Sequence, residues 1–219
     1  AELAIINGIQ QGLAAELDFQ AIIDLVGDKL REVFNTPDFM ISWHDEKANL
    51  MRYPYLYEHG KRITVPPIPP LPGGKFETMQ KTRQPIVFNT LADYQTINAA
   101  VIPGTDQSKS LVAIPIISGD RVLGLIQLEN FEHENVYGES ELRLLTTIAP
   151  SLGAALENAR LFDETQHLLK ETEQHAAELT TINTISSALA GELDLSALIN
   201  LVGEQIRTAF NADLSYVAL

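Results

Sequence analysis

The chain has 219 residues, 45% of them hydrophobic and 20% charged, a balance that fits a folded protein with a sizeable core and excludes disordered material. Lysines and arginines total 15 against 29 aspartates and glutamates, so the formal net charge is -14. A charge of this sign repels phosphate backbones and anionic lipid headgroups, which argues against nucleic acid and membrane as partners.

The first part of the chain predicts a pair of helices. Residues 3–15 form a helical segment, and residues 19–34 form a second helix with Asp18 as its N-cap. Apolar residues recur at helical spacing along one face of the second helix. We therefore expect both helices to cover one face of a sheet.

Five strand-like segments follow, interrupted by a short helix and an irregular stretch. The strands are predicted at 39–43, 51–57, 86–88, 111–117 and 122–128. The short helix is expected at 76–81 and the irregular stretch at about 91–109. Gly119 and Asp120 indicate a short hairpin between the last two strands. This order favours an α+β domain with an antiparallel sheet.

The apolar segments also bear on location. The longest of them, at 111–117 and 122–128, are far shorter than the ~20 residues that span a bilayer, and the first residues carry no signal-peptide pattern. We therefore expect a cytoplasmic protein.

A long exit helix is predicted from about Ser140, where Glu139 and Glu141 suit the positive end of a helix. Beyond about residue 158 no sheet remains for it to cover, yet a row of mainly apolar residues continues: Leu161, Leu168, His175, Ile182 and Leu189. We expect a parallel homodimer whose contact is centred on this connector and on the first helix pair. The alternative is that an incomplete second unit exposes its helices and associates without physiological meaning.

The opening segment recurs near the end of the chain. ELAIINGIQQGLAAELDFQAIIDLVGDKLREVFN begins at Glu2 and is echoed from Glu178 by ELTTINTISSALAGELDLSALINLVGEQIRTAFN, with Asp194 in the place of Asp18. After the second copy only ADLSYVAL remains, and one strand cannot form a sheet alone. We therefore divide the chain into a complete domain at 1–160, a helical connector at 161–177 and an incomplete second domain at 178–219.

Five segments together resemble the GAF family of small-molecule sensor domains. They are the opening helix that ends near FN, the strand ISWHDE, and the segments KTRQPIVFNTLAD, LVAIPIISGDRVLGLIQLEN and ESELRLLTTIAPSLGAALENARLF. The resemblance implies a central antiparallel sheet, with the N- and C-terminal helices on one face and a lidded pocket on the other. It also implies tandem copies and an output domain, such as a histidine kinase or a cyclase, elsewhere in a longer chain.

Three special activities of this family can be tested against the residues. Cyclic-nucleotide-binding members carry Asn-Lys, a later Phe and Asp-Glu, but Asn130 is followed here by Phe131, and the later positions hold Tyr137, Glu141 and Leu142. This mismatch argues against a cyclic nucleotide. Covalent bilin attachment and methionine sulfoxide reduction both use cysteine, which the sequence lacks. No nucleophile elbow, P-loop or His-Glu-x-x-His metal motif is present either, so we expect a non-enzymatic protein without a metal.

Strand alternation suggests which residues face the pocket. On the last strand Gln127 belongs to the set Leu123, Leu125, Gln127 and Glu129, and this polar set is expected to face a partly wet cavity. The irregular stretch at 93–106 resembles the lid of the family. The candidate ligand-binding residues are Trp43, Tyr94, Asn98, Thr105 and Gln127. The competing view is that these residues fill a small second core.

The leading interpretation is a sensory segment of a signal-transduction protein that binds a small molecule non-covalently and relays its state through the connector. The alternative is a ligandless scaffold that dimerises and spaces other domains.

Overall fold

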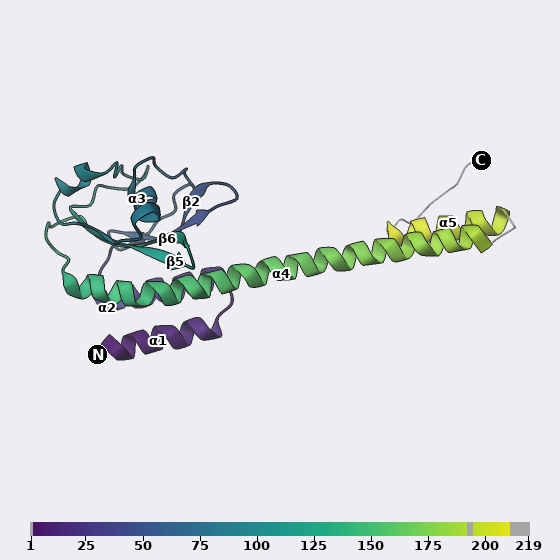
Figure 1. Ribbon diagram of the computed structural model, residues 1–219, viewed down its shortest axis with the longest axis horizontal. Coiled ribbons are helices and arrows are strands. Elements are labelled where there is room, and N and C mark those ends of the chain that lie inside the picture. The colour runs from purple at the N-terminus through teal and green to yellow at the C-terminus, as the bar shows by residue number, and fades with distance from the viewer. Residues whose placement is uncertain (1, 192–194, 211–219) are drawn as a thin grey trace. The chain divides into compact units, whose positions relative to one another are not determined.

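The computed structural model describes residues 2–191 and 195–210 (Figure 1). The chain divides into two compact units, Ala1–Phe162 and Asp163–Leu219, and each is described by itself.

The first unit contains a sheet of six strands and the helices around it. The strands are β1 (Phe39–Asp45), β2 (Leu50–Glu58), β3 (Lys61–Arg62), β4 (Ile86–Phe88), β5 (Ser110–Ser118) and β6 (Arg121–Asn130). The helices are α1 (Glu2–Ala15), α2 (Phe19–Phe34), α3 (Lys75–Thr82), the 3-10 turn η1 (Asp93–Thr96) and the first part of α4 (Glu139–Gly191).

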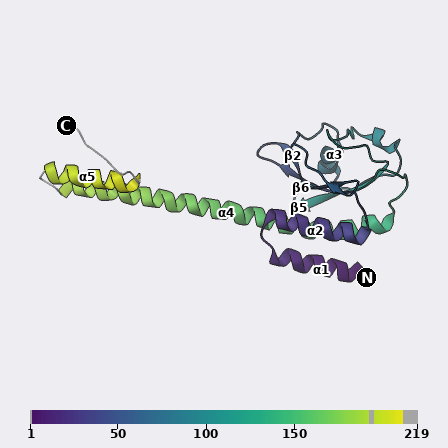
Figure 2. The ribbon, with the colours of Figure 1, turned by 180° about the vertical axis from the view of Figure 1, so that it is seen from behind.

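All pairings in the sheet are antiparallel, and the strand order is β3-β2-β1-β6-β5-β4. Helices α2 and α4 cover one face, and α1 lies on the same side, farther from the sheet (Figures 1 and 2). The opposite face carries α3 and the irregular segments around η1. The predicted α+β architecture is therefore confirmed.

Two apolar clusters fill the two faces. The larger one joins α1, α2 and α4 to the sheet, and it completely buries Val26, Ile126 and Leu152. The smaller one lies under α3 and η1 and includes Phe76, Met79, Phe88 and Leu125. This second cluster forms the floor and walls of the region where the resemblance places a pocket.

Most predicted boundaries are close to those observed. Asp18 caps α2 as expected, because its carboxylate accepts a hydrogen bond from the Ala21 amide at 2.7 Å. The five predicted strands are present, four of them longer by one or more residues. Strand β3 was not predicted, because its two residues are exposed and have no apolar pattern.

The predicted alternation of β6 was wrong at the start of the strand. The register between β5 and β6 shifts where Ile116 pairs with Gly124 but Ile117 pairs with Val122, which leaves Leu123 as an extra residue. Leu123 consequently joins the helix-side cluster and Val122 joins the other one. Residues after the bulge keep the predicted faces.

Helix α4 packs unusually close to the sheet at Gly153. A Cβ atom at this position would overlap the carbonyl oxygen of Ile117 on β5. Only glycine permits this backbone approach. The position fixes how α4 lies on the sheet.

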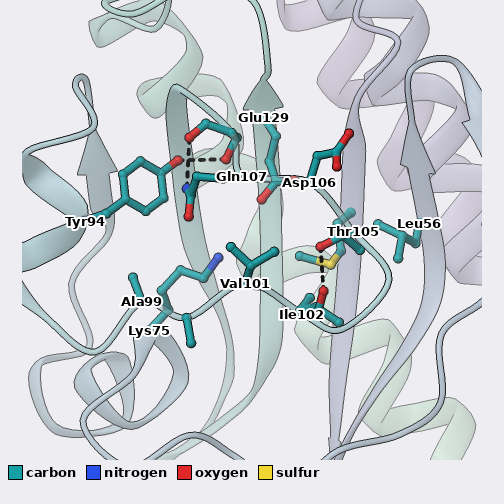
Figure 3. Close-up of a pocket in the computed structure, with 13 residues that line it drawn as sticks. Leu56, Lys75, Tyr94, Ala99, Val101, Ile102, Thr105, Asp106, Gln107 and Glu129 are labelled. Atoms are coloured by element: carbon teal, nitrogen blue, oxygen red, sulfur yellow. Dashed lines mark hydrogen bonds between the residues drawn. The ribbon is translucent and has the colours of Figure 1, made fainter.

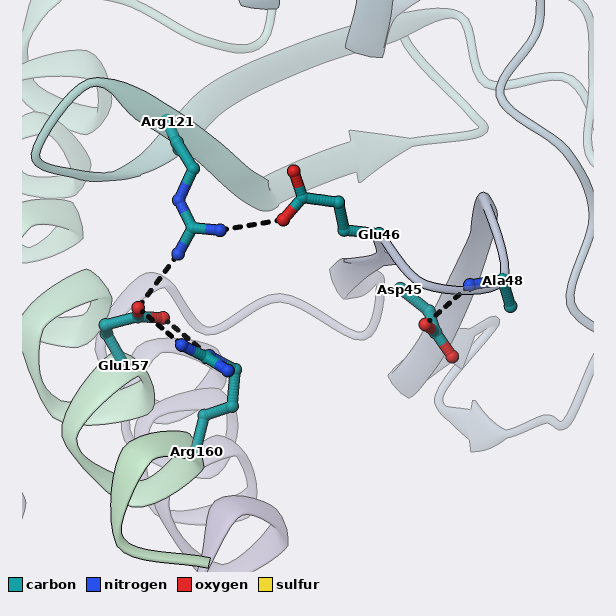
Figure 4. A network of polar contacts seen from close by, with 6 residues as sticks. All are labelled: Asp45, Glu46, Ala48, Arg121, Glu157 and Arg160. Atoms are coloured by element: carbon teal, nitrogen blue, oxygen red, sulfur yellow. Dashed lines mark hydrogen bonds and ion pairs between the residues drawn. The ribbon is translucent and has the colours of Figure 1, made fainter. Parts of the chain in front are cut away.

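An ion-pair network joins α4 to the loops at one end of the sheet (Figure 4). Arg121, at the start of β6, contacts Glu46 at 2.7 Å and Glu157 of α4 at 2.8 Å. Arg160 contacts the same Glu157 carboxylate at 3.0 Å, and this hydrogen bond is the main cause that lowers the pKa of Glu157. The strand that borders the pocket is thus tied to the exit helix.

The second unit contains the rest of α4 and helix α5 (Leu195–Ala209). The predicted connector at 161–177 is helical, and both helices of the second repeat are found, the first as the end of α4. Asp194 and the strand expected at 212–219 lie outside the described residues. None of the helices in the described ranges combines the length and apolarity needed to cross a bilayer.

We predict that Gly153→Ala lowers the free energy of unfolding by about 1–3 kcal/mol, because the new methyl group must displace α4 from β5. Gly8→Ala on α1 is the matched control, since nothing lies within 4 Å of the added carbon. That change should raise stability by up to about 1 kcal/mol through helix propensity. Urea denaturation followed by circular dichroism measures both, and an unchanged Gly153→Ala variant would contradict the contact.

Candidate ligand-binding site

Two small adjoining cavities lie between the sheet and the segment over it. We call residues 93–106 the lid. The first, the Glu129 cavity, has about 20 Å³, and the second, the Gln127 cavity, has about 50 Å³. Both are lined by Lys75, Ala100 and Ile102, so they form two parts of one pocket. Each part has room for at least one water-sized group.

Lys75 enters the pocket because of a tight turn before α3. Gly73 has a positive φ of 69°, and a Cβ atom on Gly74 would lie 2.9 Å from the carbonyl oxygen of Leu71. The Glu77 carboxylate accepts a hydrogen bond from the Gly73 amide at 2.8 Å and holds the turn. Lys75 is the first residue of α3, and its amine points into the Glu129 cavity (Figure 3).

Glu129 brings an opposite charge to the same pocket from β6. Burial lowers the pKa of Lys75, an effect that the charge of Glu129 opposes. Burial likewise raises the pKa of Glu129, opposed by the charge of Lys75. Both side chains are half-buried, and within the described ranges neither makes a hydrogen bond or an ion pair, so each charge is partly removed from water without full compensation.

Two neutral polar groups in the Gln127 cavity are also without partners. Gln127 is 2% exposed and Ser42 is 1% exposed. The Oε1 atom of Gln127 and the Oγ atom of Ser42 have no hydrogen-bond partner among the residues that the structure describes. Leaving such groups unsatisfied costs about 1–3 kcal/mol each, and the cavity places them where a ligand could satisfy them. Met51, Phe76 and Leu125 form the apolar wall beside them.

The lid closes the pocket through Tyr94 and Thr105. The Tyr94 hydroxyl shares a hydrogen bond of 2.7 Å with the Ser108 hydroxyl, and its ring packs 4.4 Å from that of Phe88. Burial raises the pKa of Tyr94, so it stays a neutral hydroxyl at physiological pH. The Thr105 hydroxyl donates to the Ile102 carbonyl at 2.9 Å and stabilises the turn at the end of the lid.

A polar cluster fastens the end of the lid to β2 and the turn after it. Glu58 accepts a hydrogen bond from the Asp106 amide at 2.9 Å, and the His59 ring contacts the Asp106 carboxylate at 3.1 Å. The hydrogen bond to Asp106 raises the pKa of His59. The three side chains offer cation ligand atoms within 4.8 Å of one another. They are already partnered with each other and with the lid backbone, so we interpret the cluster as a latch.

Comparison with known protein families matches residues 16–157 to the GAF domain. The chain belongs to the GAF domain family. It is 24% identical over 225 residues to the formate hydrogenlyase transcriptional activator of Salmonella typhimurium and to that of Escherichia coli. The match covers 98% of this chain but only 32% of each relative, so the chain spans about a third of their length.

Solved structures show the same fold at low identity. The GAF domain of an Acinetobacter phosphoenolpyruvate-protein phosphotransferase has a TM-score of 0.62 and 13% identity, covering 73% of this chain and 94% of that one. The free methionine-R-sulfoxide reductase of Neisseria meningitidis, solved with its substrate, has a TM-score of 0.60 and 18% identity, covering 73% and 90%. The structural neighbours therefore include a GAF domain that is one part of a larger protein and a protein named as a reductase.

The GAF fold brings together three of the five candidate residues. Tyr94 and Thr105 line the Glu129 cavity, and Gln127 lines the adjoining one. Asn98 is exposed, and its side-chain amide donates to the Pro72 carbonyl at 2.9 Å, which ties the lid to the loop before α3.

The predicted place of Trp43 in the pocket was wrong. Trp43 lies in the helix-side cluster, and its ring packs edge-on against that of Phe19 at 4.8 Å. The register explains this position: Trp43 pairs with Gly124, whereas its neighbour Ser42 pairs with lid-facing Leu125.

Lys75 and Glu129 were missed as site residues. Glu129 had a sequence signal, because it shares a face with Gln127 two positions away. Lys75 had none, since a lysine at the start of a short helix is normally exposed.

We predict that the unliganded double variant Lys75→Met/Glu129→Gln is more stable than the natural protein by up to about 2 kcal/mol, because it removes two half-buried charges that are incompletely compensated. Lys81→Met on the same helix is the control. Lys81 is exposed, and its ion pair with Glu77, at 3.6 Å, lies at the surface. Because surface ion pairs contribute little, its replacement should change stability by less than about 0.5 kcal/mol. A double variant less stable than the natural protein in chemical denaturation would show that the pair supports the fold.

Proposed function

We propose that this GAF domain is the sensory part of a regulatory protein and binds a small molecule non-covalently in the lidded pocket. The observation that carries the proposal is one pocket that collects the half-buried, unpartnered charges of Lys75 and Glu129 and the buried, unpartnered polar atoms of Gln127 and Ser42. Buried polar groups in folded proteins are normally satisfied, so a site that leaves several of them open is suited to a ligand that completes them. The proposed role is binding and not catalysis.

The relatives support a regulatory setting. The curated relatives described above are transcriptional activators about three times as long as this chain. We propose that an output domain lies outside the 219 residues and that the second repeat, from residue 178, begins another GAF domain. The helical end of α4 followed by α5 supports the second domain, because it reproduces the order of α1 and α2.

A route from pocket to exit helix is available along β6. This strand carries Gln127 and Glu129 at one end and Arg121 at the other, and Arg121 contacts Glu157 of α4. A ligand shifts an equilibrium only by its different affinity for the two states. Binding that favours the closed lid would therefore also favour one position of β6 and of its contact with α4.

A thermal-shift screen of the full chain tests the proposal, with nucleotides, amino acids, oxoacids and tetrapyrroles as probes. Binding to the native state raises the apparent melting temperature by mass action. We expect a saturable shift with at least one compound, lost in Lys75→Met and retained in Lys81→Met. The sensory proposal fails if no compound gives a saturable shift, or if the shift survives in Lys75→Met.

The second candidate function is a dimerising spacer, and the exposed apolar row on α4 favours it. Leu161 is 47% exposed, Leu168 is 55% exposed and Ile182 is 56% exposed. An amphipathic helix is stabilised mainly by packing its apolar face, and a parallel second copy of the chain would cover this row. The two functions are compatible, since a sensor also needs a relay.

Light scattering of Leu168→Glu tests the dimer. The charge placed in the apolar row should weaken self-association at least tenfold, whereas Gln166→Glu, an exposed change outside the row, should leave it unchanged. A natural chain that is monomeric at micromolar concentration would contradict the dimer. Equal association of the two variants would place the interface elsewhere.

A further inference from the structure

We propose that the pocket binds a small zwitterion of the α-amino acid type, with the ligand carboxylate at Lys75 and the ligand ammonium group at Glu129 and Gln127. This inference rests on the proposed sensory function and adds the chemical class of the ligand.

The unpartnered groups of the pocket divide into a donor and acceptors. The Lys75 amine offers donors only, whereas the Glu129 carboxylate and the Gln127 Oε1 atom accept. Gln127 and Glu129 are two residues apart on β6, so their Cα atoms are about 7 Å apart and both side chains leave the same face. A ligand that satisfies all three groups needs an anionic acceptor at one end and a donor-rich cation at the other.

The two opposite charges of the pocket disfavour ligands that carry only one charge. A monocarboxylate would compensate Lys75 but would meet the like charge of Glu129 in a site of low dielectric constant. An amine would compensate Glu129, near which Asp106 also lines the cavity, but it would leave Lys75 without an anionic partner. A zwitterion gives each buried charge an opposite partner. Lys75 and Glu129 do not form an ion pair with each other, so the ligand has none to break.

The size and lining of the pocket restrict the rest of the molecule. With the lid closed, the two cavities of about 20 and 50 Å³ hold only a few non-hydrogen atoms beyond the polar ends. The wall of the Gln127 cavity is apolar at Met51, Phe76 and Leu125, next to the Ser42 hydroxyl. These features suit a short side chain, aliphatic or bearing one hydroxyl, and not a nucleotide or a tetrapyrrole.

Isothermal titration calorimetry on the full chain tests the inference with glycine, L-alanine, L-serine and L-valine. Propionate and ethylamine are the matched probes, because each keeps one charged end of alanine and lacks the other. We expect saturable binding of at least one amino acid. We also expect propionate and ethylamine to bind at least tenfold more weakly than the amino acid that binds best.

Variants assign the two ends of the ligand. We expect at least tenfold weaker amino acid binding in Lys75→Met and in Glu129→Gln. Lys75→Arg keeps the positive charge and should retain most of the binding. Lys81→Met should bind as the natural protein does. Glu129→Gln should in addition reduce the preference for alanine over propionate, which a merely structural role would not do. Denaturation curves of each variant establish that it is folded.

The failures of the two proposals can be distinguished. If propionate binds as tightly as the best amino acid, or if no amino acid binds while another library compound gives a shift that Lys75→Met abolishes, the zwitterion is wrong and the sensory function stands. If no compound in the library binds, both are wrong.

Discussion

The close packing of α2 and α4 on one face of the sheet is the constraint on which the rest of the domain depends. At Gly27 there is no room for a side chain, because the Tyr55 ring occupies the space, and at Gly153 the backbone of β5 does so. The helix-side cluster is consequently filled completely, with Val26, Ile126 and Leu152 at zero exposure. The pocket between the sheet and the lid forms on the other face, where a short helix and a loop replace the long helices.

That second face is closed by partly buried apolar residues of the lid, Tyr94, Ile97 and Ala99, together with a few polar attachments. The lid is held by Tyr94 at Ser108, by Asn98 at the loop before α3 and by Asp106 at Glu58 and His59. Hydrogen bonds of this kind are modest, each about 0.5–1.5 kcal/mol net. A segment fastened in this way opens at lower free energy than the sheet beneath it. The architecture thus combines a fixed floor with a cover that can respond to a ligand.

Periodicity was sufficient to predict the helices, the long strands and the side on which Gln127 lies, because these features follow from burial of one face of each element. It failed where pairing between strands decides the outcome. The bulge at Leu123 and the helix-side position of Trp43 depend on register with neighbours that are distant in sequence. Lys75 reaches the pocket only because of the turn at Gly73 and Gly74, which no local pattern announces.

The alternation of β6 has a consequence for how such a domain can evolve. Ile126 and Leu128 face packed helices, so nearly every substitution there disturbs the scaffold. Their neighbours Gln127 and Glu129 contact a cavity, and an exchange at either position alters the charge or hydrogen bonding of the pocket while the helix side stays intact. Residues adjacent in the chain are therefore under separate selection. Under the proposed sensory function, one or two substitutions on the lid side of a single strand would be enough to change the chemical class of the ligand, with the same scaffold and the same exit helix inherited unchanged.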